Sequence, residues 1–278
     1  MTWVAVVLIG LGVADLVRTS LSRRRRLAAH LIGPVVVLAV ALLSGVSGWA
    51  DAIALLLALG GCALWTELSD RAQTTGRPAI WALTALGGTL AGLLAFSGAT
   101  TRPNGPLESW LGWADLPGSG PPDSGRVLLL TGLVLFNLAT ANIVVRLVLL
   151  AIGALRPDQL TLPRQPQAAD RLKGGRLLGP MERLVILGLG LAGEFGAAGL
   201  VIAAKGLLRF PEIQASARGS AASLRASGTA GSANPALPSG TTAGTRTGPA
   251  GIDDVTEYFL VGSFVSWLLA LGSLAVAR

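Results

Sequence analysis

The stretch Val127–Leu155, VLLLTGLVLFNLATANIVVRLVLLAIGAL, decides the fold class because it is longer and more apolar than most helices of water-soluble domains. A helix needs about 20 apolar residues to cross the hydrocarbon core of a bilayer, which is roughly 30 Å thick. Arg146 is the one ionisable residue in the stretch. We therefore interpret it as a membrane-spanning helix that is long enough to tilt or to extend beyond the membrane.

The composition of the whole chain points to the same solvent, because 51% of its 278 residues are hydrophobic and only 13% are charged. Soluble domains carry roughly 25% charged residues, so an ordinary soluble enzyme is excluded. The single cysteine, Cys62, excludes an intrachain disulfide and a cysteine-based zinc or iron–sulfur site. The sequence contains no P-loop, nucleophile elbow or HExxH motif, and we predict no catalytic residue, no metal and no cofactor.

Six further apolar segments predict an all-α, polytopic membrane protein with about seven transmembrane helices. The predicted spans are Trp3–Val17, Leu27–Ser44, Ala52–Thr66, Pro78–Phe96, Val127–Leu155, Leu184–Ala204 and Tyr258–Val276. The first of them is short for a bilayer, and the number of spans falls to six if it only lies on the membrane surface.

The segments divide the chain into regions of different character. We predict an N-terminal four-helix membrane region at 1–100, an external loop at 101–126, the fifth transmembrane helix at 127–155, a basic cytoplasmic loop at 156–183 and a C-terminal helix pair at 184–278. The helix pair is interrupted at 211–252 by a segment of mostly Ala, Gly, Ser, Thr and Pro, which we predict to be a disordered tether.

The external loop contains the sequence PLESWLGWADLP, at Pro106–Pro117. A helix here would place four apolar side chains largely on one face, namely Leu107, Trp110, Leu111 and Trp113. This pattern is typical of a helix that lies in the membrane interface, and an irregular loop with incidental tryptophans is the alternative.

Basic residues set the predicted orientation, because short cytoplasmic loops are enriched in Lys and Arg. An N-terminus outside the cell places the block Arg23–Arg26 and the basic residues of 156–183 inside, and leaves only Arg102 and Arg126 in the short outside loops. We therefore predict an N-out/C-in topology. Contacts of the inside loops with anionic lipid headgroups account for the net charge of +7, so no nucleic-acid partner is implied.

Ionisable side chains at bilayer depth need a partner or a purpose, because each one costs at least ~2.5 kcal/mol on insertion scales. Glu194, in the middle of the sixth predicted span, is either a proton or cation site or a carboxyl group hydrogen-bonded within the bundle. Asn142 and Arg146 lie one turn apart on the same helix face, and Asn137 lies about half a turn away from it. Arg146 either pairs with Glu194 across the bundle or extends to the inner membrane surface.

Two further titratable residues lie near the inner ends of predicted spans. Asp15 is close to the end of the first span, and His30, the only histidine, is in the first turn of the second. They could meet as an acid and a titrating imidazole. The alternative is that both are solvated or loosely paired end groups near Arg18 and Arg23–Arg26.

Small residues form stripes at helical spacing on the last two predicted spans. They are Gly188, Ala192, Gly196 and Gly199 on the sixth and Gly262, Ser266, Ala270 and Ser273 on the seventh. Such stripes allow helix backbones to approach closely, so we predict that the two helices pack together, with a homodimer as the alternative. An outer ion-pair cluster is predicted next to them from Lys205 and Arg209 with Asp253, Asp254 and Glu257.

The C-terminal third also carries a series of short motifs, which are Glu182-Arg183, Gly193-Glu194-Phe195, Ala203-Ala204-Lys205, Arg209-Phe210 and the run EYFLVGS from Glu257 to Ser263. They resemble the C-terminal region of the bacterial integral membrane family called domain of unknown function 3307, in which glutamine takes the place of Glu194. The resemblance implies a helical architecture and a bacterial inner (plasma) membrane location, and it implies no established activity.

We expect from these observations a bacterial integral membrane protein that is not an enzyme and acts as a scaffold or a subunit of a membrane complex. Its expected partners are membrane lipids and either a second copy or another membrane protein. The alternative is a small transporter or channel whose polar path uses Glu194, Asn142 and Arg146.

Overall fold

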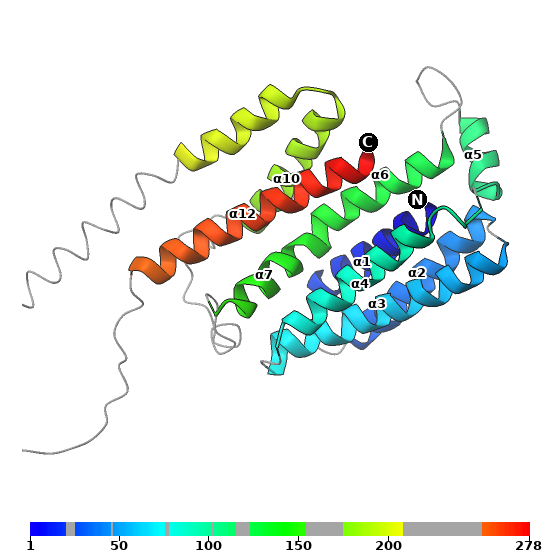
Figure 1. Ribbon diagram of the computed structural model, residues 1–278, viewed down its shortest axis with the longest axis horizontal. Coiled ribbons are helices and arrows are strands. Elements are labelled where there is room, and N and C mark those ends of the chain that lie inside the picture. The colour runs from blue at the N-terminus through cyan, green and yellow to red at the C-terminus, as the bar shows by residue number, and fades with distance from the viewer. Residues whose placement is uncertain are drawn as a thin grey trace, which may run out of the picture.

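The computed structural model describes residues 1–20, 26–45, 47–75, 78–101, 103–114, 123–153, 175–207 and 252–278. Within these ranges the chain is helical and contains no β-strand. The helices pack as a bundle with their axes roughly aligned (Figure 1). The all-helical class is therefore confirmed.

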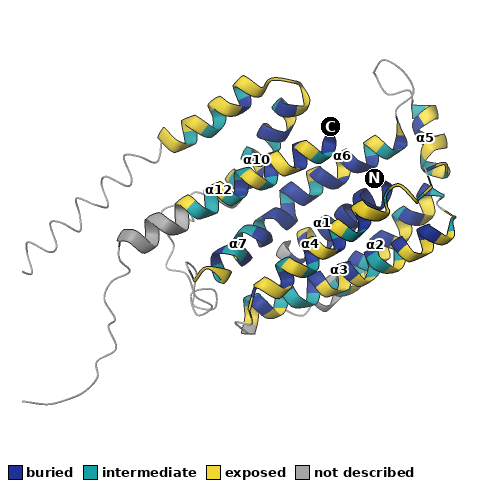
Figure 2. Ribbon diagram, in the orientation of Figure 1, coloured by how far each residue is buried: buried dark blue, intermediate teal, exposed yellow. Residues whose placement is uncertain are grey.

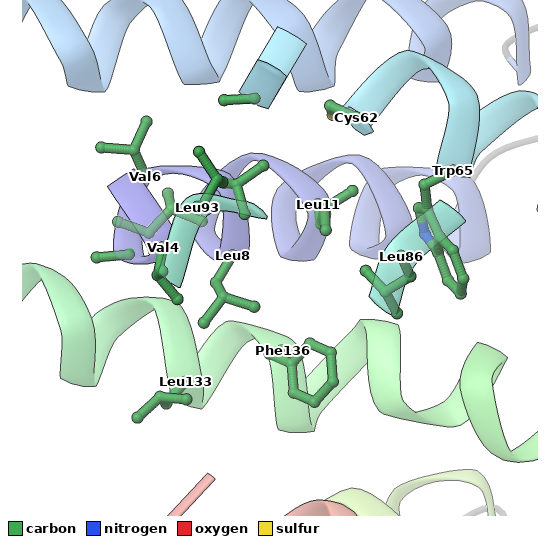
Figure 3. Packing of buried hydrophobic residues seen from close by; sticks show 14 of the residues in the cluster. Val4, Val6, Leu8, Leu11, Cys62, Trp65, Leu86, Leu93, Leu133 and Phe136 are labelled. Carbon is green, nitrogen blue, oxygen red and sulfur yellow. The ribbon is translucent and has the colours of Figure 1, made fainter. Parts of the chain in front are cut away.

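The first helix, α1 (Thr2–Ser20), lies at the centre of the bundle, and its residues from Trp3 to Leu11 are almost all buried. It contacts α2 (Arg26–Ser44) and α3 (Trp49–Thr75). Most of the buried apolar core gathers around it (Figure 3). This central position does not support the alternative in which the segment only lies on the membrane surface.

Two shorter helices complete the N-terminal half. Helix α4 (Ile80–Phe96) packs mainly against α3, and α5 (Pro106–Ala114) contacts α2 and α6. In α5 Leu111 is buried, whereas Trp110 and Trp113 are 55% and 81% exposed. The predicted shared face is thus divided, with Leu111 turned toward the bundle and the two indoles turned away from it.

The stretch that decides the fold class forms one long helix with a π-helical segment in its middle. Its parts are α6 (Ser124–Leu135), the π segment η2 (Phe136–Thr140) and α7 (Ala141–Ala151). Close approach to α1 depends on glycine, because a Cβ atom on Gly132 would collide with the backbone of Ala5. The long helix runs in the same direction as α1.

Within the described residues, three helices are long and apolar enough to cross a membrane, and they are Trp49–Thr74, Ser124–Ala151 and Leu260–Ala277. Shorter apolar helices lie at His30–Ser44, Ile80–Phe96 and Phe195–Leu207. The chain thus has the helices of a membrane protein, although three candidate spans are fewer than the seven that the sequence predicts.

The sixth predicted span, Leu184–Ala204, is not one helix. Helix α10 (Gly175–Leu191) ends at a short turn, and a second helix, Phe195–Leu207, follows it. Gly193 in the turn has a φ of +85°, a conformation that glycine adopts at little cost. The second helix doubles back along α10 (Figure 1), since Lys205 near its end pairs with Glu182 in the middle of α10. The sequence prediction of a continuous span is therefore wrong here.

The start of α10 also moves a predicted boundary. The sequence predicts a basic cytoplasmic loop at 156–183. In the structure, residues from Gly175 onward are helical and Arg183 is buried inside the bundle. Residues 154–174 and the predicted tether, apart from Ile252, lie outside the described residues.

The last helix, α12 (Ile252–Ala277), lies against α10, α7 and α6. It runs parallel to α10, because Arg183 meets Ser266 and, two turns later, Gly190 meets Leu274. The C-terminus therefore lies toward the same end of the bundle as the N-terminus (Figure 1), so the structure does not support the predicted N-out/C-in arrangement. The doubling back of Phe195–Leu207 is the reason, because it returns the chain to the end from which α10 started.

Candidate functional site

Buried and half-buried polar side chains lie in two groups near the π segment, one between α1 and α3 and one between η2, α7, α10 and α12. We call this set the polar layer, and it consists of Asp15, Arg18, Trp65, Asn137, Asn142, Arg183, Ser266 and Ser273. Ionisable groups buried in membrane helices mark functional or strongly constrained positions, and π-helical segments often occur at functional sites. The polar layer is therefore the candidate site.

One half of the polar layer is an ion pair between Asp15 and Arg18, one turn apart on α1. The Arg18 Nη2 atom lies 2.9 Å from Oδ1 of Asp15, which is fully buried. The indole N–H of Trp65 donates to the other carboxylate oxygen at 3.1 Å. Arg18 also donates to the Ser69 hydroxyl at 2.9 Å, so the pair ties α1 to α3.

The other half is the guanidinium of Arg183, whose side chain is only 2% exposed. Its Nε and Nη2 atoms donate to the main-chain carbonyl of Asn137 at 3.1 and 2.9 Å, and its Nη1 donates to the Ser266 hydroxyl at 3.0 Å. Nη2 also donates to the side-chain oxygen of Asn142. Four of the five N–H groups that a guanidinium carries are thus used, all on neutral oxygens.

Asn137 joins the π segment to α12. Its side-chain Nδ2 donates to the Leu133 carbonyl and to the Ser273 hydroxyl, both at 2.9 Å. Two serines of the predicted small-residue stripe, Ser266 and Ser273, are therefore hydrogen-bond partners as well as small side chains. Ala270 between them is fully buried, and Gly262 faces α7.

The predicted polar path is not assembled in the described part of the chain. Glu194 is exposed and lies in the turn after α10, eleven residues beyond Arg183. Arg146 is exposed near the opposite end of the bundle and donates to Gln73 at 3.4 Å. The predicted pair of Glu194 and Arg146 is therefore wrong, because the break at Gly193 leaves the two residues at different heights.

Asp15 and His30 do not meet either. The imidazole Nε2 of His30 lies 3.2 Å from a carboxylate oxygen of Glu67 on α3, which also pairs with Arg71. The alternative of a solvated or loosely paired end group is wrong for Asp15, which is fully buried. His30 is partly exposed and paired with Glu67, which agrees with the predicted alternative of a loosely paired end group.

Lys205 has a different partner from the predicted one. It pairs with Glu182 on α10, and the other oxygen of that carboxylate accepts the indole N–H of Trp267 at 2.9 Å. Of the rest of the predicted cluster, Arg209 lies outside the described residues, and Asp253, Asp254 and Glu257 are described only as part of the α12 backbone.

The stripe predicted on the sixth span does not face α12. Gly188, Ala192, Gly196 and Gly199 are all exposed, and a Cβ atom on any of the three glycines would meet nothing within 4 Å. Helix α10 instead packs through Gly190, where a Cβ atom would collide with Leu274, and through Arg183. The two helices do lie together, but through another face of α10.

Sequence reasoning missed Arg183, Glu182 and Asp51. Asp51 begins α3 and accepts hydrogen bonds from the Trp3 indole at 2.8 Å and the Thr101 hydroxyl at 2.6 Å. A signal existed for Arg183, because apolar residues occur on both sides of it in LLGPMERLVIL, which favours a helix that starts before it.

Comparison with known proteins finds no match among protein families, curated proteins or solved structures. The resemblance of the C-terminal motifs to domain of unknown function 3307 thus stays a prediction, and the geometry alone supports a function.

Proposed function

We propose that the chain is a multi-pass protein of the bacterial inner membrane that acts as a scaffold or a subunit of a membrane complex and catalyses no reaction itself. The polar layer supports this role, because most of its donors and acceptors are engaged with one another. The exceptions among the described residues are the side-chain oxygen of Asn137 and, beside the layer, the hydroxyl of Thr140, which are buried without a hydrogen-bond partner. Arg183 holds α7, η2 and α12 together, and Asp15 with Arg18 holds α1 to α3. Such a layer fixes how helices pack and leaves few groups for a substrate.

The observation that carries the proposal is the open surface around the turn after α10. Gly188, Gly196 and Gly199 are exposed there with no neighbour where a side chain would begin. Glycines on membrane helices typically serve close contact with another helix, yet no described helix of this chain contacts these three. A second polypeptide in the membrane is the partner that such a surface fits.

The test is to fill the open surface. Gly196→Leu and Gly199→Leu are expected to abolish the larger assembly in native mass spectrometry from mild detergent, while the amount of the chain in the membrane stays unchanged. Leucine also has a helix propensity about 1 kcal/mol better than glycine, so local unfolding would not explain a loss.

Gly87→Leu and Gly88→Leu on α4 are the matched controls, since these glycines are also exposed with nothing within 4 Å. They are expected to leave the assembly intact. An assembly that survives both Gly196→Leu and Gly199→Leu would contradict the proposed docking surface.

We further propose that the end of the bundle near Arg71 and Arg146 faces the cytoplasm and contacts anionic lipid headgroups. The segments that join the helices at this end contain the block Arg23–Arg26 and the basic residues of 154–174 in the sequence. This distribution satisfies the enrichment of Lys and Arg on the cytoplasmic side and places the N-terminus outside.

A small transporter or channel is the second candidate. The break at Gly193 within an apolar segment favours it, because interrupted helices are common in transporters and the exposed backbone usually lines a cavity. If this function holds, Arg183→Gln will abolish solute flux into proteoliposomes that contain the same amount of folded protein as those of the wild type, and Arg146→Gln will not. Equal flux for wild type and Arg183→Gln would remove this candidate.

A further inference from the structure

The returning helix Phe195–Leu207, which we call the arm, is held by few contacts. Ala198 is its only buried residue, and Leu200 and Leu207 are more than 70% exposed (Figure 2). Membrane lipids can cover such apolar side chains, but they do not hold the arm in one position. Its place beside α10 must therefore depend on the few specific contacts that it makes.

The described residues show two specific contacts of the arm, namely the Arg278 guanidinium 4.5 Å from the centre of the Phe195 ring at its start and a latch at its end. Lys205 of the arm pairs with Glu182 of α10, and Trp267 of α12 donates to the same carboxylate at 2.9 Å. The Glu182 side chain is 8% exposed, so its pairing with a cation carries more weight than a surface ion pair. Glu182 and Trp267 together form a receptor for an ammonium group.

The hinge between the arm and α10 is short and unpacked. It consists of residues 192–194, and a Cβ atom on Gly193 would meet nothing within 4 Å. Main-chain hydrogen bonds close the turn, and the longest-range of them joins Glu194 N to the Leu189 carbonyl at 2.9 Å. A short hinge followed by a detachable helix is the arrangement that allows identical elements to be exchanged between protomers.

We propose that two copies of this chain exchange their arms, so that Lys205 of each copy pairs with Glu182 of the other. This inference rests on the proposed function and names the partner as a second copy. The exchanged form keeps the ion pair and the indole hydrogen bond, because both are made between identical surfaces. It also brings the two turns together, next to Gly196 and Gly199, which one copy alone leaves open.

Charge reversal tests the exchange. Glu182→Lys alone places two lysines at the latch, and Lys205→Glu alone places two carboxylates there, in one copy or between two. When the two differently tagged variants are made in the same cell, opposite charges meet only between copies. We expect each variant alone to lose the dimer and the mixture to recover it, with the two tags purifying together.

The variant Glu182→Lys/Lys205→Glu, which restores the pair within one chain and between chains, is the folding control. If it is abundant and the mixed single variants do not associate, the exchange is overturned. The proposed function then still stands if the glycine substitutions dissolve an assembly with another protein, so the two failures are distinguishable.

Crosslinking keeps the inference testable if the single variants do not accumulate. In a Cys62→Ala background, one tagged chain carries Glu182→Cys and the other carries Lys205→Cys, and a bismaleimide is applied to membranes. Exchange predicts a crosslink between the two tags. Replacing the first chain by one with Arg146→Cys, on an exposed position distant from the turn, is expected to give none, and no crosslink in either mixture contradicts the exchange.

Discussion

Replacing Asp15 with leucine is expected to lower the free energy of unfolding by roughly 3–5 kcal/mol, because it leaves Arg18 as an unpaired cation among apolar helices. Asp15 is fully buried and accepts hydrogen bonds from both Arg18 and Trp65. The leucine variant removes the carboxylate but not the cost of burying the guanidinium. Equilibrium unfolding in mixed micelles, followed by tryptophan fluorescence, measures the change.

Two comparisons make this result specific. Asp15→Leu/Arg18→Leu removes both charges and is expected to recover at least half of the lost free energy, since a buried ion pair replaced by apolar side chains is often neutral. Glu194→Leu changes an exposed carboxylate in the turn and is expected to cost little. A double variant no more stable than Asp15→Leu would show that the ion pair is not the cause.

These two acidic residues also show how far the sequence predicts the site. The sequence places Glu194 at mid-membrane because its segment is apolar throughout and contains no proline. The break depends on a glycine with positive φ and on a partner for Lys205 that lies 23 residues earlier. Hydropathy shows neither the positive φ nor the partner of Lys205. Glu194, which the sequence singles out as the leading candidate for a functional site, therefore lies exposed in a turn.

The burial of Asp15 is not predicted by the sequence, for a different reason. Asp15 lies toward the end of a short apolar segment, where a charge is normally solvated. Its burial comes from α3 and the π segment, which are distant in the sequence and surround α1. The helices themselves follow from apolar length, and the long helix Ser124–Ala151 matches the predicted span closely. Which charges become buried depends on how the helices are arranged around each other.

The second prediction concerns the C-terminus, where the two arrangements of the sixth segment give opposite results. A reporter fused after Arg278 is expected on the same side of the membrane as the N-terminus. A reporter inserted in 208–251 is expected on the other side, with the loop 154–174. A continuous span at Leu184–Ala204 reverses both positions. Alkaline phosphatase and a fluorescent protein, active on opposite sides of an inner membrane, distinguish the outcomes.

The energies of the two arrangements favour the turn. A continuous helix would place Glu194 near the middle of the membrane, which costs at least ~2.5 kcal/mol, and would separate Lys205 from Glu182. The turn costs little main-chain hydrogen bonding, because Ala192, Gly193 and Glu194 donate to carbonyls of α10 at 2.9 to 3.2 Å. If the reporters show the continuous arrangement, Lys205 cannot pair with Glu182. The latch is then absent, and the proposed exchange of arms is contradicted as well.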